Sequence, residues 1–298
     1  MADATVAVPR RPLLLALPWT TFTFLTRWPV IPLFILSVLV ITAVFAPWLA
    51  PHDPIKTSLG DRNTPPVWYP QGSTKNLLGT DPVGRDVLSR IIFGARVSLL
   101  VVGVSLATGL VVGMGLGLIA GYFGGHLDEF ITRLVDIWLA LPFILVALAV
   151  VIVLGQSFTV MMGLLALLAW TPFVRNVRAE VLSLKTRDYV AQAKVAGAST
   201  ARILLVHILP GVLNTVVVIA TLRVGQLILA EAILSFLGAG IPPPTPAWGV
   251  MVADGRNYVH DAWWVSFFPG MAILLVVMSL NFLGDWLRDY SDPRLRQL

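Results

Sequence analysis

Long stretches without a charged side chain are the feature that most limits how this chain can fold. No charge occurs from Trp28 to Pro51, from Val97 to Gly125 or from Ile137 to Val174. About 20 apolar residues in a helix cross the roughly 30 Å hydrocarbon core of a bilayer. Only 12% of the residues are charged, about half the share found in soluble domains. The composition excludes an ordinary soluble enzyme, a disordered chain and a disulfide scaffold, and it predicts a polytopic membrane protein.

Six transmembrane helices are expected, which places the chain in the all-α class. The charge-free stretch Ile137–Val174 has 38 residues and would measure about 57 Å as one helix, nearly twice the bilayer core. It must therefore fold back, and Gly155-Gln156-Ser157 is the expected turn. The other spans are expected over 30–49, 97–125, 212–237 and 262–284.

Lysine and arginine set the expected orientation. With the N-terminus inside, thirteen of these residues lie on the cytosolic side and seven lie outside, so both termini are predicted to be cytosolic. These loop residues explain the formal net charge of +5 better than nucleic-acid binding does. The expected organisation is a cytosolic tail and interfacial segment (1–29), a first transmembrane helix (30–49), an external loop (50–96), a five-helix core (97–284) and a cytosolic tail (285–298).

The end of the external loop predicts an amphipathic helix that lies at the outer membrane interface. Asp81 can cap this helix and Pro82 suits its first position. Three polar residues, Arg85, Asp86 and Arg90, lie off its apolar face. That face is formed by Val83, Val87, Leu88, Ile91 and Ile92.

Small residues recur at every fourth position of the second span. Small residues at this period let two helix backbones approach closely in lipid. We expect a helix-packing contact here, without a chemical role. The residues are Ser105, Gly109, Gly113, Gly117 and Gly121.

The segment 175–210 is the most polar long stretch of the core and forms the expected cytosolic loop. Asp188 can cap a helix over Tyr189–Ala196, and Gly197 offers the left-handed conformation that ends a helix. Ser199 can cap a second short helix, which Pro210 is expected to end near the membrane. Since a connector needs only a few residues, this helix–turn–helix predicts a docking surface that faces the cytosol.

A few polar side chains lie inside the fifth span. Arg223 is about 16 Å into it, and a charge at that depth should face a cavity, a partner chain or a counter-charge. Gln226 and Glu231 share its sector of the helix, whereas Asn214 and Thr221 lie on the opposite face. All five are candidates for lining a translocation path. A structural contact is an equal alternative for Arg223 and the favoured interpretation for Glu231.

Catalytic and metal sites are not expected. No group of His, Asp and Glu has the spacing of a metal site such as HExxH, and no GxSxG nucleophile motif occurs. Asp136, where the third span begins, is instead expected to pair with Arg133 three residues earlier.

The cytosolic loop resembles a known sequence pattern. Asp188-Tyr189-Val190, Gly197-Ala198-Ser199 and His207-Ile208-Leu209-Pro210 resemble the "EAA" loop of binding-protein-dependent ABC importer permeases. Ala191-Gln192-Ala193 occupy the E-A-A positions, so Ala191 stands where the family has glutamate. Leu234-Ser235-Phe236-Leu237-Gly238 further resembles the fifth-span exit of dipeptide and oligopeptide permeases, in the second permease subunit of the DppC/OppC type.

The resemblance implies a type I ABC importer permease fold, in a subunit that moves di- or oligopeptides from an external solute-binding protein into the cytosol. The implied partners are a second, homologous permease subunit of the DppB/OppB type and two ATPase subunits, which would bind ATP and magnesium. This chain would bind no cofactor, and it contains no GxxxxGK[ST] loop. The implied location is a bacterial or archaeal plasma membrane. The residues implied in coupling to an ATPase are Asp188, Tyr189, Val190, Ala191, Gln192, Ala193, Gly197 and Ala198.

Alternative functions stay open at this point. Within the same family, a nickel complex or an oligosaccharide is an alternative substrate. A stand-alone secondary transporter would show inverted repeats and broken helices, which the sequence does not display, and it would leave the docking loop unexplained. An intramembrane enzyme would need a catalytic constellation, and none is recognisable.

Overall fold

The computed structural model describes residues 29–291, so the expected N-terminal tail and interfacial segment and the chain beyond Ser291 lie outside the described residues. Within this range every regular element is a helix. The α-helices are α2 (Val30–Val44), α3 (Ala46–Leu49), α4 (Val87–Phe123), α5 (Gly125–Ala140), α6 (Phe143–Leu154), α7 (Phe158–Leu184), α8 (Asp188–Val195), α9 (Thr200–Arg202), α10 (Leu209–Phe236), α11 (Trp248–Gly255) and α12 (Trp264–Ser291). Two 3₁₀ turns, Leu59–Asp61 and Arg256–Tyr258, and one π-helix, Ile203–Ile208, complete the elements.

Four of the described helical segments are long and apolar enough to cross a membrane: Val87–Phe123, Phe158–Leu184, Thr200–Phe236 and Trp264–Tyr290. The pair α5 and α6 adds a fifth segment if it is counted as one broken span. The all-α membrane fold is thereby confirmed. The expected count of six would also need the 15-residue helix α2 to cross, and it stays a prediction.

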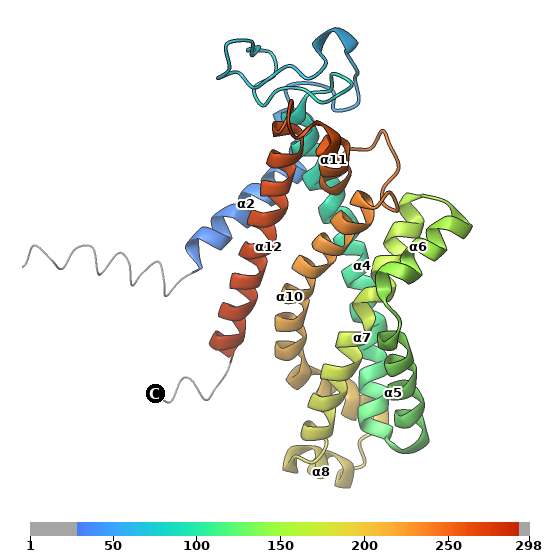
Figure 1. The fold of residues 1–298 in the computed structure, drawn as a ribbon. Coiled ribbons are helices and arrows are strands. Elements are labelled where there is room, and N and C mark those ends of the chain that lie inside the picture. The colour runs from blue at the N-terminus through green and yellow to red at the C-terminus, as the bar shows by residue number, and fades with distance from the viewer. Residues whose placement is uncertain (1–28, 292–298) are drawn as a thin grey trace, which may run out of the picture.

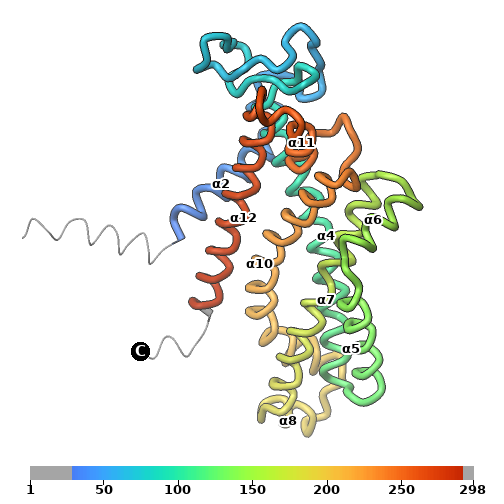
Figure 2. The backbone as a smooth tube through the Cα atoms, viewed as in Figure 1, coloured from blue at the N-terminus to red at the C-terminus, as the bar shows by residue number. Residues whose placement is uncertain are grey.

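The helices form an elongated bundle with two distinct ends. Figures 1 and 2 show the irregular segment 50–86 gathered at one end, near α11, and α8 at the opposite end. We call these the loop end and the α8 end. The helices α4 and α7 pack along each other, and α10 contacts both α7 and α12. One large apolar core joins α4, α7, α10, α11 and α12, and a smaller one lies toward the α8 end.

The expected turn at 155–157 is confirmed. Helix α6 ends at Leu154, Gly155 has a φ of +80°, and α7 begins at Phe158. The Ser157 hydroxyl accepts a hydrogen bond from the Val160 N–H at 3.1 Å. A positive φ is available to glycine without a Cβ clash, and serine is a good N-cap, so these residues end one helix and begin the next.

A second break, between α5 and α6, was not expected. The two helices meet at an angle of 82°, so the third span is not one straight helix. Pro142 lies at the break and acts as the N-cap of α6, whereas Leu141 before it has an extended conformation. Proline disfavours a helical conformation in the preceding residue, which explains the bend.

The expectation of a separate amphipathic helix at 81–96 is wrong. Asp81 accepts hydrogen bonds from the Val83 and Arg85 N–H groups at 3.0 and 2.9 Å, which makes a turn rather than a helix start. Gly84 follows with a φ of +79°, which interrupts any helix. Helix α4 begins at Val87, is capped by the Asp86 carboxylate, and continues through the second span without a break.

Pro210 does not end the helix that begins after Ser199. The chain from Thr200 to Phe236 is helical throughout, and Pro210 lies in the first turn of α10. Proline has no N–H to donate to the carbonyl four residues back, so its place in this continuous helix coincides with a change from π- to α-helical hydrogen bonding. The π-helix Ile203–Ile208 precedes it, and the Leu209 N–H donates to the Leu204 carbonyl five residues back.

Candidate functional site

The helix–turn–helix at the α8 end is built from local signals. Asp188 lies in the first turn of α8 rather than before it, because Arg187 is the N-cap. At the other end the Gly197 N–H donates to Lys194 O and the Ala198 N–H donates to Ala193 O, both at 3.0 Å. Gly197 has a φ of +78°, so the ending is a Schellman motif, as the sequence predicts.

Helix α8 is attached to the bundle through one side. Val190 is fully buried and packs in the smaller core with Ile203, Ile208 and Val212. The Lys194 ammonium lies 5.5 Å from the centre of the Tyr122 ring, in a cation–π contact. The other coupling residues lie at the surface or are partly buried: Asp188, Tyr189, Ala191, Gln192, Ala193, Gly197 and Ala198. Helix α8 thus presents one face outward and packs with the other on the π-helix Ile203–Ile208, which leads into α10.

The five small residues of α4 lie against α7. All five are buried, and the Ser105 hydroxyl donates to Met162 O at 3.2 Å. A Cβ placed on Gly117 would lie 2.8 Å from the Val177 Cβ and 2.9 Å from Val174 O. The helices therefore approach so closely at these positions that no larger residue fits. The nearest α7 residues around Gly109, Gly113 and Gly121 are Ala169, Trp170, Phe173, Arg178 and Val181.

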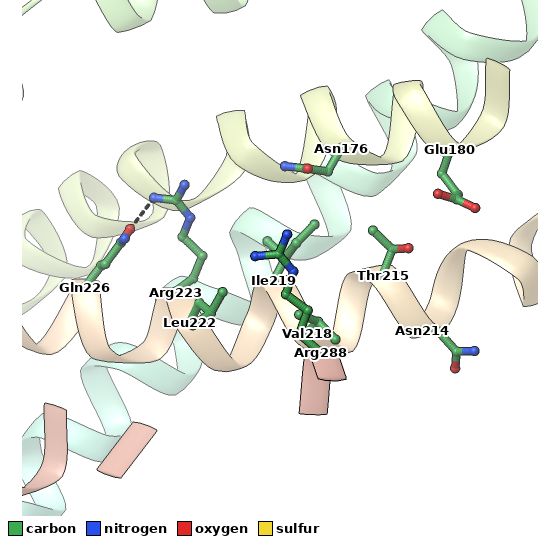
Figure 3. Close-up of a pocket in the computed structure, with 10 residues that line it drawn as sticks. All are labelled: Asn176, Glu180, Asn214, Thr215, Val218, Ile219, Leu222, Arg223, Gln226 and Arg288. Carbon is green, nitrogen blue, oxygen red and sulfur yellow. Dashed lines mark hydrogen bonds between the residues drawn. The ribbon is translucent and has the colours of Figure 1, made fainter. Parts of the chain in front are cut away.

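An open cavity of about 660 Å³ lies between α7, α10 and α12. Its polar lining comes from three helices: Asn176 and Glu180 from α7; Asn214, Thr215, Arg223 and Gln226 from α10; and Arg288 from α12. Val218, Ile219 and Leu222 form the apolar part of the wall. Figure 3 shows Arg223 and Gln226 at one end of the cavity and Glu180 with Asn214 at the other.

Three of the five candidate path residues line the cavity and two do not. Arg223, Gln226 and Asn214 line the cavity, and the Arg223 guanidinium donates to the Gln226 side-chain oxygen. Thr221 donates its hydroxyl to Val217 O of its own helix at 2.9 Å and is not part of the lining. Glu231 is 1% exposed, accepts a hydrogen bond from Ser235 at 2.7 Å and is also not part of the lining.

Four polar lining residues are not among the candidates that the sequence predicts: Asn176, Glu180, Thr215 and Arg288. Asn176 and Glu180 fall within the expected cytosolic loop, but they lie in the last turns of α7, four residues apart. Arg288 was placed in a tail, but α12 continues past it. The spacing of Asn176 and Glu180 was the available signal, since residues four apart share a helical face.

Ion pairs between α5 and α7 correct one expected contact. Arg133 pairs with Glu129 at 2.6 Å, whereas Asp136 pairs with Arg175 of α7 at 2.5 Å. Asp128 binds Arg178 through two hydrogen bonds in a second α5–α7 pair. The expected Arg133–Asp136 pair is therefore wrong, because the packing of α5 on α7 offers Asp136 a cation that is distant in the sequence.

A buried charge cluster joins the loop end to α11. Arg85 contacts Asp81 at 2.5 Å and Asp254 of α11 at 3.1 Å, and Arg90 lies 3.8 Å from both carboxylates. Arg90 is only 1% exposed, so the helix face that was expected to be polar is buried here. Buried charges are stable only when paired, so this cluster anchors the segment before α4 to α11.

Within residues 29–291 no group of three or more His, Cys, Asp or Glu residues could hold a metal ion.

Family comparisons agree over most of the chain. Residues 113–297 match the family described as binding-protein-dependent transport system inner membrane component. Residues 27–66 match the N-terminal transmembrane domain of oligopeptide transport permease C.

Curated relatives match nearly the full chain. The chain is 44% identical over 264 residues to the di/tripeptide transport system permease protein DppC of Pseudomonas aeruginosa, covering 89% of this chain and 87% of that protein. It is 46% identical over 268 residues to the dipeptide transport system permease protein DppC of Escherichia coli K12, covering 90% and 89%. The chain is 38% identical to the dipeptide transport system permease protein DppC of Bacillus subtilis, and the match covers 89% of this chain and 81% of that protein.

A solved structure shares the fold. A chain of the MetNI methionine ABC transporter in an inward-facing conformation superposes with a TM-score of 0.56 at 20% sequence identity. The match covers 68% of this chain and 97% of that chain. The fold is thus that of a type I ABC importer permease.

Proposed function

The chain belongs to the binding-protein-dependent transport system inner membrane component family, and we propose that it is a permease subunit that carries di- or oligopeptides. Its relatives of 38–46% identity are named as dipeptide or di/tripeptide permeases, which supports a peptide over a nickel complex or an oligosaccharide. The substrate arrives from an external solute-binding protein and enters the cytosol of a bacterium.

The proposed assembly needs four further polypeptides: a second permease subunit, two ATPase subunits and a solute-binding protein. A second, homologous permease subunit completes the pore, because one open cavity on one chain does not enclose a path. Two ATPase subunits bind ATP and magnesium and hydrolyse the nucleotide, and the solute-binding protein docks on the outside. In this proposal the chain itself is not an enzyme.

The observation that carries the proposal is the attachment of α8. In the proposed orientation the α8 end faces the cytosol and the loop end faces outward, with both termini inside. The exposed face of α8 would dock in an ATPase subunit. Val190 is buried in one apolar core with Ile203 and Val212, and α8 packs on the π-helix Ile203–Ile208. A displacement of α8 would therefore pass through that π-helix to α10, which carries Arg223. Nucleotide-driven closure of the ATPase pair would thereby move a wall of the cavity.

Gly197→Val is expected to lower ATP-driven uptake at least tenfold. A residue with a Cβ pays about 1–2 kcal/mol in the left-handed conformation, so the turn after α8 would change its path. No atom lies within 4 Å of a Cβ at Gly197, so the rest of the fold should stay intact. The measurement is peptide uptake together with co-purification of the ATPase subunits.

Ala196→Val provides the matched control for this turn. Ala196 is exposed and has an ordinary φ of −71°, so the same side chain should be accepted there with near-normal uptake. Normal uptake in the Gly197→Val transporter would contradict the docking role of α8.

The function itself is tested with the complete transporter in proteoliposomes. Uptake of radiolabelled dialanine should require ATP and the solute-binding protein. Omission of ATP is the control. Uptake of a nickel complex or an oligosaccharide in place of the peptide would contradict the substrate class. Uptake driven by an ion gradient without ATP would contradict the whole proposal in favour of a secondary transporter.

A further inference from the structure

Three charged side chains line the cavity between α7, α10 and α12: Glu180 toward one end, Arg223 toward the other, and Arg288 of α12 between them in the view of Figure 3. Helices α7 and α10 run in opposite directions, so Glu180, near the end of α7, lies beside the start of α10. Arg223 lies 14 residues after Leu209, about 21 Å along α10, and therefore near its middle. The cavity thus has an acidic group near the α8 end and a guanidinium deep in the membrane-spanning part.

These charges have no ionic partner within the described part of the chain. Every ion pair among residues 29–291 involves other side chains, so Glu180, Arg223 and Arg288 have no opposite charge within 4 Å there. Arg223 makes its hydrogen bond to the neutral side chain of Gln226, which holds the guanidinium without neutralising it. An unpaired charge at the membrane depth of Arg223 is costly, which indicates that a ligand or a partner supplies its counter-charge.

The distance between the two ends suits a short peptide. From Thr215, which is drawn toward the Glu180 end of the cavity in Figure 3, to Arg223 the rise along α10 is about 12 Å. An extended peptide spans about 3.3–3.6 Å per residue, so a di- or tripeptide measures roughly 7–11 Å from end to end. The side chains of glutamate and arginine can cover the remaining gap. A volume of about 660 Å³ is also within the range of small-ligand sites.

We propose that Arg223 binds the terminal carboxylate of the transported peptide and that Glu180 binds its terminal ammonium group. This inference rests on the proposed function and adds to it the recognition of both termini inside the permease. Guanidinium–carboxylate and carboxylate–ammonium contacts are charge-assisted hydrogen bonds, about twice as strong as neutral ones. Asn176 and Asn214 supply neutral polar groups between and beside the charges, suited to the peptide backbone.

A single cysteine can report on occupancy of the cavity. The chain contains no cysteine, so Val218→Cys would give this subunit one thiol in the cavity wall. In the complete purified transporter, without nucleotide or solute-binding protein, the rate of maleimide labelling of this subunit is measured against added peptide. Dialanine should slow the labelling. Two analogues should each need about tenfold higher concentration to slow the labelling equally. These are dialanine amide, which lacks the carboxylate, and N-acetyl-dialanine, which lacks the ammonium group.

Two substitutions assign the ends of the peptide. Arg223→Gln should raise the half-protecting concentration of dialanine about tenfold and leave that of dialanine amide unchanged. Glu180→Gln should likewise raise the half-protecting concentration of dialanine about tenfold and leave that of N-acetyl-dialanine unchanged. Arg288→Gln removes the same charge from the same cavity and is the matched control, for which a smaller effect is expected.

Several results would overturn the assignment. Equal protection by all three peptides, absence of protection by any of them, or an equal effect of Arg288→Gln and Arg223→Gln would each exclude recognition of the termini. Loss of the second permease subunit from the purified Arg223→Gln complex would assign Arg223 to a subunit interface instead. ATP-driven uptake of dialanine by the unsubstituted transporter tests the proposed function separately, so uptake without protection defeats only this inference.

Discussion

Asp81→Asn is expected to destabilise the folded chain by about 3–5 kcal/mol, because it leaves the buried Arg90 and the partly buried Arg85 with one partly exposed carboxylate. Asp81 contacts Arg85 at 2.5 Å and lies 3.8 Å from the fully buried Arg90. The remaining carboxylate, Asp254, is 36% exposed; it lies farther from Arg85, at 3.1 Å, and equally far from Arg90, at 3.8 Å. Asparagine keeps an oxygen that can accept the two backbone hydrogen bonds of the turn, so the substitution removes mainly the charge.

The measurement for Asp81→Asn is thermal unfolding in detergent micelles. A loss of 3–5 kcal/mol corresponds to a fall in the melting temperature of at least about 6 °C for a chain of this size. Protease cleavage within 50–86 should also become faster, since the cluster anchors that segment to α11. Glu129→Gln is the control, because the Glu129–Arg133 pair is exposed and exposed pairs contribute about 0–1 kcal/mol. Equal melting temperatures for Asp81→Asn and the unsubstituted chain would contradict the anchoring role.

Gly117→Leu is expected to cost at least about 3 kcal/mol by forcing α4 away from α7. A Cβ at Gly117 would lie 2.8 Å from the Val177 Cβ and 2.9 Å from the backbone oxygen of Val174. Overpacking usually costs about 1–3 kcal/mol, and here a backbone atom cannot rotate out of the way as a side chain could. The loss should appear as a lower melting temperature and as less folded subunit in the membrane.

Gly115→Leu is the matched control for the α4–α7 contact. Gly115 lies two residues earlier on the same helix and has no atom within 4 Å of its Cβ position. Leucine has a higher helix propensity than glycine by nearly 1 kcal/mol, so this variant should be as stable as the unsubstituted chain or slightly more stable. The same fall in both variants would show that the α4–α7 approach is not what requires glycine at position 117.

Local features of the fold could be predicted from the sequence wherever one short segment decides the outcome. The turn at Gly155 and the end of α8 at Gly197 both follow from a glycine with positive φ. The small residues from Ser105 to Gly121 share one face of α4 because of the helical period alone. The resemblance to ABC importer permeases likewise rested on motifs within short segments, and the family is confirmed.

Predictions failed where the answer depended on a distant part of the chain. Asp136 had a cation three residues away, but the packing of α5 on α7 brings Arg175 closer. Arg90 was expected at a polar helix surface, yet α11 covers it and supplies Asp254. Asn176, Glu180 and Arg288 were assigned to loops and tails because helix ends cannot be located from hydropathy when polar residues continue a helix into a cavity.

The sequence by itself determined that this is an all-helical membrane chain and where most of its apolar helices lie. It also determined where a polar helix–turn–helix segment interrupts them. Those properties follow from hydropathy, helical period and the conformational rules for glycine and proline, which act over a few residues. Only the tertiary structure decided which charges are paired, how α8 packs on the π-helix that leads into α10, and which side chains line the cavity. The physical reason is that ionic contacts act over a few ångströms in space, and the helices that come within that distance are far apart along the chain.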